Sequence, residues 1–107
     1  MSSHSEWLAS RDLDVPPELT ACVRDLLASR PEWERLGRAD AFVRASEQLL
    51  RRVLVGGAMA RTNALDLLAA DACVTWAFEA ASDEPKTVAA LAERATKGIA
   101  AIAAEFA

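Results

Sequence analysis

The sequence predicts an all-α protein, and more specifically an antiparallel four-helix bundle with helices at about residues 16–29, 31–55, 58–82 and 84–106. Proline is absent between Pro31 and Pro85, and the only glycines in that stretch are Gly37 and the adjacent pair Gly56 and Gly57. Because proline and glycine are the residues that most reliably end a helix, we expect two long helices that are separated near the glycine pair. Apolar residues recur every three or four positions along each expected helix, as in amphipathic helices.

The first helix is expected to begin near Pro16, because proline is tolerated in a first turn whose N–H groups have no partner within the helix. Its apolar residues follow the i, i+3, i+4, i+7, i+8 pattern and form one stripe: Leu19, Cys22, Val23, Leu26 and Leu27. We expect residues 1–14 to be a flexible N-terminal arm and residues 15–107 to be a single helical domain.

The second helix is expected to begin at Pro31, and Gly37 is a weak point at which its first turn can separate from the rest. The glycine pair at 56 and 57 suits a helix C-terminus, although the sequence leaves open whether it forms a turn or a kink. The start of the third helix is also open, because Thr62 and Asn63 resemble capping residues and the loop can extend to Arg61.

The third helix is apolar over more than half of its circumference, so we expect it to be the central element of the bundle. The fourth helix follows a cap, two acids and Pro85, which together are typical of a helix start. In this fourth helix the larger apolar side chains step by three or four residues to the end of the chain.

Composition excludes several classes of function. Lys and Arg number 12 against 16 Asp and Glu, and the resulting net charge of −4 disfavours binding to nucleic acid or to anionic membranes. Apolar stretches are interrupted by charges before they reach the length of a membrane span. No apolar leader segment precedes the first helix, so we expect a cytoplasmic protein without nucleic-acid or membrane partners.

The residues of common catalytic and metal sites are also missing from the sequence. His4 is the only histidine, which leaves no His-based triad or di-iron site. Cys22 and Cys73 lack the spacing of a zinc or redox motif, so both are expected to be free thiols. We therefore predict no catalytic residues, no metal and no cofactor.

One segment has a family resemblance. Residues 68–79, with the sequence LAADACVTWAFE, resemble a helix of trans-prenyl diphosphate synthases, which are all-helical enzymes. That family binds magnesium and diphosphate through two aspartate-rich motifs, and neither motif is present in this much shorter chain. The resemblance therefore implies a shared style of helix packing and no prenyl-transfer activity.

Two functional hypotheses remain. The leading one is a non-enzymatic helical interaction or regulatory module, which acts as a homodimer or packs against a helix of another protein, because short amphipathic helices gain stability by burying further apolar faces. Its expected interface residues are Trp33, Trp76, Phe78, Leu91, Ile99, Ile102 and Phe106.

The alternative hypothesis is a protein that binds a small anionic ligand, or a minor enzyme. It requires a cavity between the second and third helices, because arginines favour anions through paired hydrogen bonds. The expected lining residues are Arg44, Arg51, Arg61 and Asp71.

Overall fold

The structure is a computed structural model that describes residues 3–11, 15–56, 61–82 and 84–106, and all regular secondary structure in these ranges is helical. The α-helices are α1 (Ser3–Ser10), α2 (Pro17–Ser29), α3 (Arg38–Gly56), α4 (Arg61–Ala80) and α5 (Pro85–Glu105), and a short 3-10 helix, η1 (Pro31–Arg35), precedes α3. The all-α class is therefore confirmed. The four-helix bundle is not, because the described residues contain five α-helices.

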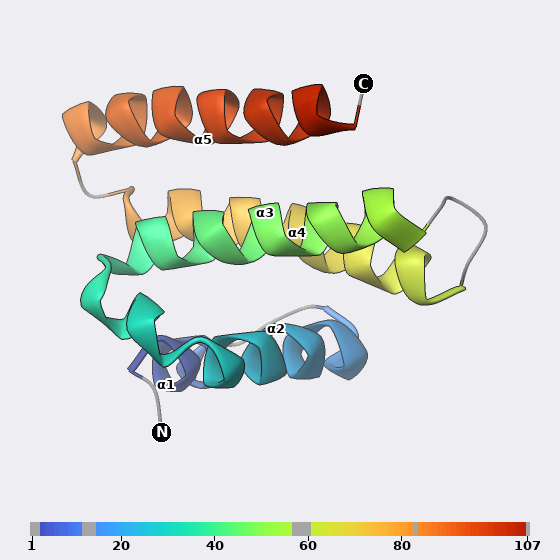
Figure 1. The fold of residues 1–107 in the computed structure, drawn as a ribbon. Helices are drawn as coiled ribbons and strands as arrows, with labels where there is room; N and C mark the ends of the chain where they lie inside the picture. Colours follow the sequence, from blue (N-terminus) through green and yellow to red (C-terminus); the bar gives the residue numbers. More distant parts are fainter. Residues whose placement is uncertain (1–2, 12–14, 57–60, 83, 107) are drawn as a thin grey trace.

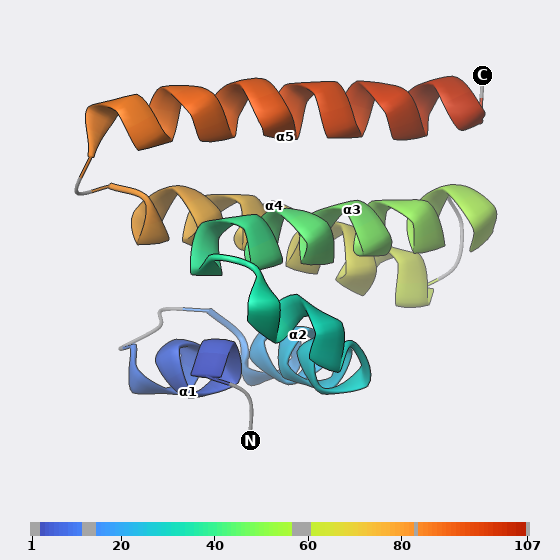
Figure 2. The ribbon, with the colours of Figure 1, turned by 60° about the vertical axis from the view of Figure 1, so that its left-hand side comes forward.

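The helices form three layers (Figures 1 and 2). Helices α1 and α2 lie side by side in one layer, α3 and α4 form the middle layer, and α5 stands alone among the described residues in the third. The contacts between α3 and α4 are the most extensive in the chain, α2 packs on α4, and α5 packs mainly on α3. The third predicted helix is therefore central, together with α3.

Helix α1 is the additional helix that the four-helix prediction does not include. It lies within residues 1–14, for which a flexible arm is expected. Leu8 is completely buried, and the ring of Trp7 lies 5.4 Å from that of Phe42 in α3. A helix of eight residues is too short to be stable in isolation. Contacts with the rest of the protein therefore hold α1 in place.

Polar contacts attach the start of α1 to η1. The Nε2 atom of His4 lies 3.1 Å from the backbone oxygen of Trp33, and the amide and hydroxyl groups of Ser3 donate hydrogen bonds of 2.6 and 2.9 Å to Glu34. The hydrophobic and polar contacts together fix α1 against both α3 and η1.

The expected helix at 31–55 is divided, as Gly37 predicted, into η1 and α3. At the other end of α3, Gly56 is the last helical residue, and Gly57 lies outside the described residues. A Cβ atom at position 56 would approach the Oδ1 atom of Asn63 to 2.7 Å, and the side chain of Asn63 donates a hydrogen bond to the backbone oxygen of Val53. Glycine is therefore required here because the first turn of α4 packs closely on the last turn of α3.

The core lies between the first two layers and continues beneath α5. Trp76 of α4 meets the ring of Phe42 edge-on at 6.0 Å, and alanines fill much of the α3–α4 contact: Ala41, Ala45, Ala69, Ala70 and Ala77 are all buried. None of the helices in the described ranges combines the length and the hydropathy needed to cross a membrane.

Substitution of Leu8 tests whether α1 is an integral part of the fold. Leu8→Ala should lower the free energy of unfolding by about 2–4 kcal/mol, because it removes a fully buried side chain and leaves a cavity. Glu6→Ala, at an exposed position of the same helix, should change it by less than about 0.5 kcal/mol. Urea denaturation measures both, and equal effects would show that α1 does not dock.

Candidate functional site

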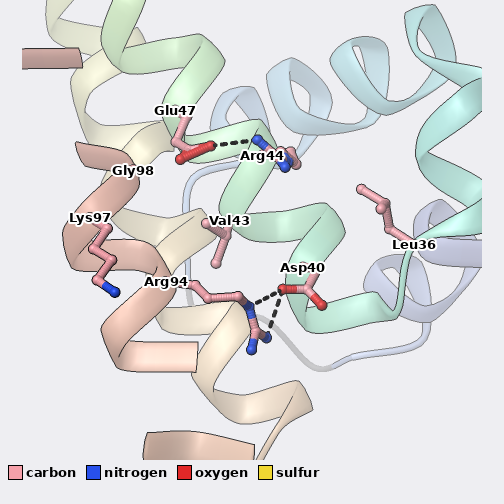
Figure 3. A pocket seen from close by; sticks show the side chains of 8 residues that line it. All are labelled: Leu36, Asp40, Val43, Arg44, Glu47, Arg94, Lys97 and Gly98. Carbon is pink, nitrogen blue, oxygen red and sulfur yellow. Dashed lines mark hydrogen bonds and ion pairs between the residues drawn. The ribbon is translucent and has the colours of Figure 1, made fainter. Parts of the chain in front are cut away.

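A cleft lined by charged residues lies between α3 and α5 (Figure 3). Its volume is about 480 Å³, and its lining combines three cations and two carboxylates with apolar surface: Leu36, Asp40, Val43, Arg44, Glu47, Arg94, Lys97 and Gly98. Side chains of α3 and α5 face each other across this cleft.

Each cation of the cleft has an acidic partner. Arg94 donates two hydrogen bonds, of 2.8 and 3.1 Å, to one oxygen of Asp40, which joins α5 to α3. Arg44 lies 3.5 Å from Glu47, and Lys97 donates to Glu93 at 2.9 Å. An anion would have to compete with these carboxylates, so the charge balance of the cleft does not favour an anionic ligand.

Glu47 and Gly98 form the closest contact across the cleft. The Glu47 side chain is only 13% exposed, and its carboxylate occupies the space that a Cβ atom on residue 98 would fill. Glycine at position 98 therefore lets α5 accommodate this partly buried carboxylate.

A smaller hollow of about 240 Å³ continues from the cleft towards η1, and both Arg44 and Arg51 line it, together with Trp33 and Ile102. Arg51 pairs with Glu105 through both of its terminal nitrogens, one of them at 3.0 Å. This hydrogen bonding raises the pKa of Arg51 above its ordinary value. The Arg51–Glu105 pair thus forms a second charged link between α3 and α5.

The structure therefore separates the residues of the expected anion site. Arg44 and Arg51 lie on the side of α3 that faces α5, whereas Asp71 lies on α4 and lines a different groove. Arg61 is the first residue of α4, and its side chain lies outside the described part of the structure. The described linings of the cleft and of the smaller hollow hold Arg44 and Arg51 without Asp71, and the role of these residues as ligands stays a prediction.

The groove on the other side of α5 is apolar. We call it the α4 groove; its volume is about 390 Å³, and it is lined by Ser46, Leu50, Leu67, Leu68, Ala70, Asp71, Val74 and Ile99. Within the described lining Asp71 is the one charged residue, and the hydroxyl of Ser46 donates to the backbone oxygen of Val43 in its own helix. The surface of the groove is therefore almost entirely apolar.

Two leucines at this groove remain in contact with solvent. Leu67 is 52% exposed and Leu68 is 58% exposed, although both belong to the central helix α4. The reason is that α5 packs mainly on α3 and does not cover these two side chains. Adjacent exposed leucines beside an apolar groove are typical of a surface that binds another molecule.

The residues predicted to form an interface have different environments. Trp76, Leu91 and Ile102 are at most 3% exposed, so they pack inside the chain and have little surface to offer a partner. Ile99 lines the α4 groove, and Phe106 is 43% exposed near the end of α5. The remaining two, Trp33 and Phe78, are half-buried and pack against the core.

Sequence analysis did not identify Leu67 and Leu68 as surface residues. A helix that is apolar on most sides must be covered on most sides to be fully buried, and a chain of this size supplies few neighbours. A largely apolar helix in a chain with few helices to cover it therefore indicates that part of the helix is exposed. Which side is exposed depends on where α5 packs.

The described residues contain no cluster of three or more His, Cys, Asp or Glu side chains that could hold a metal ion. Cys22 and Cys73 are both free thiols. Burial raises the pKa of Cys73, and burial together with the nearby Asp66 carboxylate raises the pKa of Cys22. Both thiols are therefore protonated and poorly nucleophilic at neutral pH.

No family model, curated protein or solved structure matches this chain. The resemblance of residues 68–79 to prenyl diphosphate synthases therefore rests on that segment alone.

A double-mutant cycle tests the close contact between Glu47 and Gly98. In a Glu47→Ala background, Gly98→Ala should stabilise the protein by about 1 kcal/mol, because alanine in a helix is more favourable than glycine by this amount. In the native background the gain should be smaller or reversed, since the new Cβ displaces the Glu47 carboxylate. Thermal or urea denaturation measures the four proteins, and an identical gain in both backgrounds would contradict the contact.

The environment of Cys22 predicts a pH-dependent reactivity. Its thiol donates to Asp66 at 3.7 Å, so Asp66→Asn removes a negative charge that raises the pKa of Cys22. Cys22 should then react faster with iodoacetamide at pH 8–9, as followed by mass spectrometry. Cys73, which is completely buried, should stay unmodified in both proteins; an unchanged rate at Cys22 would contradict the influence of Asp66.

Proposed function

We propose that this chain is a non-enzymatic helical interaction module that binds an apolar helix in the α4 groove. The observation that carries the proposal is the exposure of Leu67 and Leu68 beside a groove whose described lining holds a single charge. Its partner is a second copy of the chain or a helix of another protein, in keeping with the leading sequence hypothesis.

The energetics support such a binding surface. Full burial of a leucine side chain stabilises a protein or complex by roughly 1.5–3 kcal/mol. Because Leu67 and Leu68 are each about half exposed, covering both contributes on the order of 2 kcal/mol. Further apolar area on Leu50, Val74 and Ile99 adds to this gain.

The arrangement of layers favours a helix as the bound element. Helix α5 is the one described helix of the third layer (Figures 1 and 2), and it packs mainly on α3, so Leu67 and Leu68 of α4 stay exposed beside it. A helix presents apolar anchors at i, i+3, i+4 and i+7 to a groove of this kind. An antiparallel or parallel helix beside α5 would thus complete the third layer.

The alternative function, binding of a small anion, receives less support from the charges. In the α3–α5 cleft the cations Arg44, Arg94 and Lys97 are each paired with a carboxylate. The α4 groove, in turn, presents the acid Asp71, which would repel an anion.

Site-specific photocrosslinking in cells tests the proposal without assuming the identity of the partner. The benzophenone amino acid p-benzoylphenylalanine at position 67 should give a discrete crosslinked product, since the groove holds a partner there. The same photoreactive residue at position 24, which is exposed on α2 away from the groove, serves as the control. If position 67 gives no product beyond that of position 24, the proposed function is wrong.

A further inference from the structure

The distribution of charge on α5 identifies what fills the α4 groove. At 100° per residue, the charged residues of α5 fall within an arc of about 120°; they are Lys86, Glu93, Arg94, Lys97 and Glu105. On this charged side, Arg94 bonds to Asp40 of α3 in the cleft, and Glu105 bonds to Arg51 of α3, which lines the smaller hollow. The remaining two thirds or so of the circumference is uncharged.

Only part of the uncharged side is used within the chain. Leu91, Ala95 and Ile102 form the strip that is buried. Next to this strip, on the same side as Ile99, lies a second strip of small residues that is half-exposed or exposed; it consists of Ala89, Ala92, Thr96, Ala100 and Ala103. The hydroxyl of Thr96 donates to the backbone oxygen of Ala92 at 2.8 Å, so it needs no other partner.

Two exposed apolar surfaces among the described residues, on α4 and on α5, are complementary in size. The outer face of α4 projects the large side chains of Leu67 and Leu68, whereas the uncovered strip of α5 carries small side chains that let another helix approach closely. We propose that the α4 groove is filled by α5 of a second copy of this chain, and that the contact is reciprocal. This inference rests on the proposed function and names its partner.

The shape of the chain permits this reciprocal contact. Helix α5 packs mainly on α3, and the α4 groove lies beside it, with Ile99 of α5 on its wall. A two-fold axis parallel to the layers places α5 of each copy in the α4 groove of the other, so that the two α5 helices lie side by side in one completed layer. Such self-complementary contacts are the commonest basis of symmetric dimers.

The expected contact area is sufficient for a specific dimer. The 21 residues of α5 span about 31 Å, and a helix is about 10 Å wide. Each of the two equivalent contacts covers a strip of about this size on α5 of one copy and on the α4 groove of the other. Together the four strips bury about 1,200 Å², which reaches the lower end of the range for specific interfaces. We therefore expect a reversible dimer.

Sedimentation equilibrium of the full chain, combined with two matched substitutions, tests the inference. Ala103 and Ala104 are adjacent and both exposed, but Ala103 lies on the uncharged strip and Ala104 on the charged side. Ala103→Glu should raise the dimer dissociation constant at least about tenfold, because it buries an unpaired charge, whereas Ala104→Glu should leave it within about twofold of the native value. Leu67→Glu, on the other half of the contact, should weaken the dimer in the same way.

Circular dichroism confirms that the variants remain folded. The inference is overturned if the native chain is a monomer at about 100 μM, or if Ala103→Glu and Ala104→Glu have equal effects on dimerisation. A monomer that still crosslinks through position 67 to another protein would overturn only the identity of the partner, whereas the absence of any crosslink would overturn the proposed function itself.

Discussion

Helices α3 and α4 can pack closely because much of their shared surface is alanine. Ala41 and Ala45 of α3 and Ala69, Ala70 and Ala77 of α4 are all buried. Small side chains bring the helix axes together, and Phe42 and Trp76 then fill the space at the edge towards α1 and α2. The other two layers both rest on this pair, so the position of every other helix depends on it.

The chain has few large side chains with which to cover the outer surface of the α3–α4 pair. Three of the six aromatic side chains, Trp7, Phe42 and Trp76, meet in the contact between the first two layers. The third layer consists of α5, and it is attached through a narrow apolar strip and through the Arg94–Asp40 and Arg51–Glu105 pairs. Exposed ion pairs contribute little stability, so the rotation of α5 about its own axis is set chiefly by burial of Leu91, Ala95 and Ile102, and the two ion pairs agree with it. In this orientation the charged side of α5 contacts α3, and Ile99 faces the α4 groove.

This rotation links the fold to the proposed function. It places Ile99 on the wall of the α4 groove, and it keeps Arg94 and Lys97 in the cleft on the other side of the helix. The groove is apolar because most of its lining side chains, which come mainly from α3 and α4, are apolar. The charge-lined cleft in Figure 3 is accounted for by the attachment of α5, since each of its three cations is paired with a carboxylate within the chain.

Part of the architecture can be predicted from local sequence patterns. The helical class, the break at Gly37 and the central place of the helix near residues 61–80 follow from proline, glycine and the spacing of apolar residues, which act over short distances. Helix α1 was missed because its sequence is polar, and its order depends on Leu8 and Trp7 reaching a core built by later residues. The expected interface stays a prediction: of its residues, Trp76, Leu91 and Ile102 are buried within the chain, because helical spacing alone does not tell a core position from a contact with a partner.

The amino-acid sequence by itself determined that this chain forms amphipathic helices and lacks the residues of common catalytic and metal sites, because those properties depend on residue types and their spacing. Only the tertiary structure decided which apolar faces stay open. The side of α4 that remains exposed depends on where α5 packs and how it is rotated, and both follow from contacts between residues far apart in the chain, as Arg94 and Asp40 are, at a separation of 54 positions.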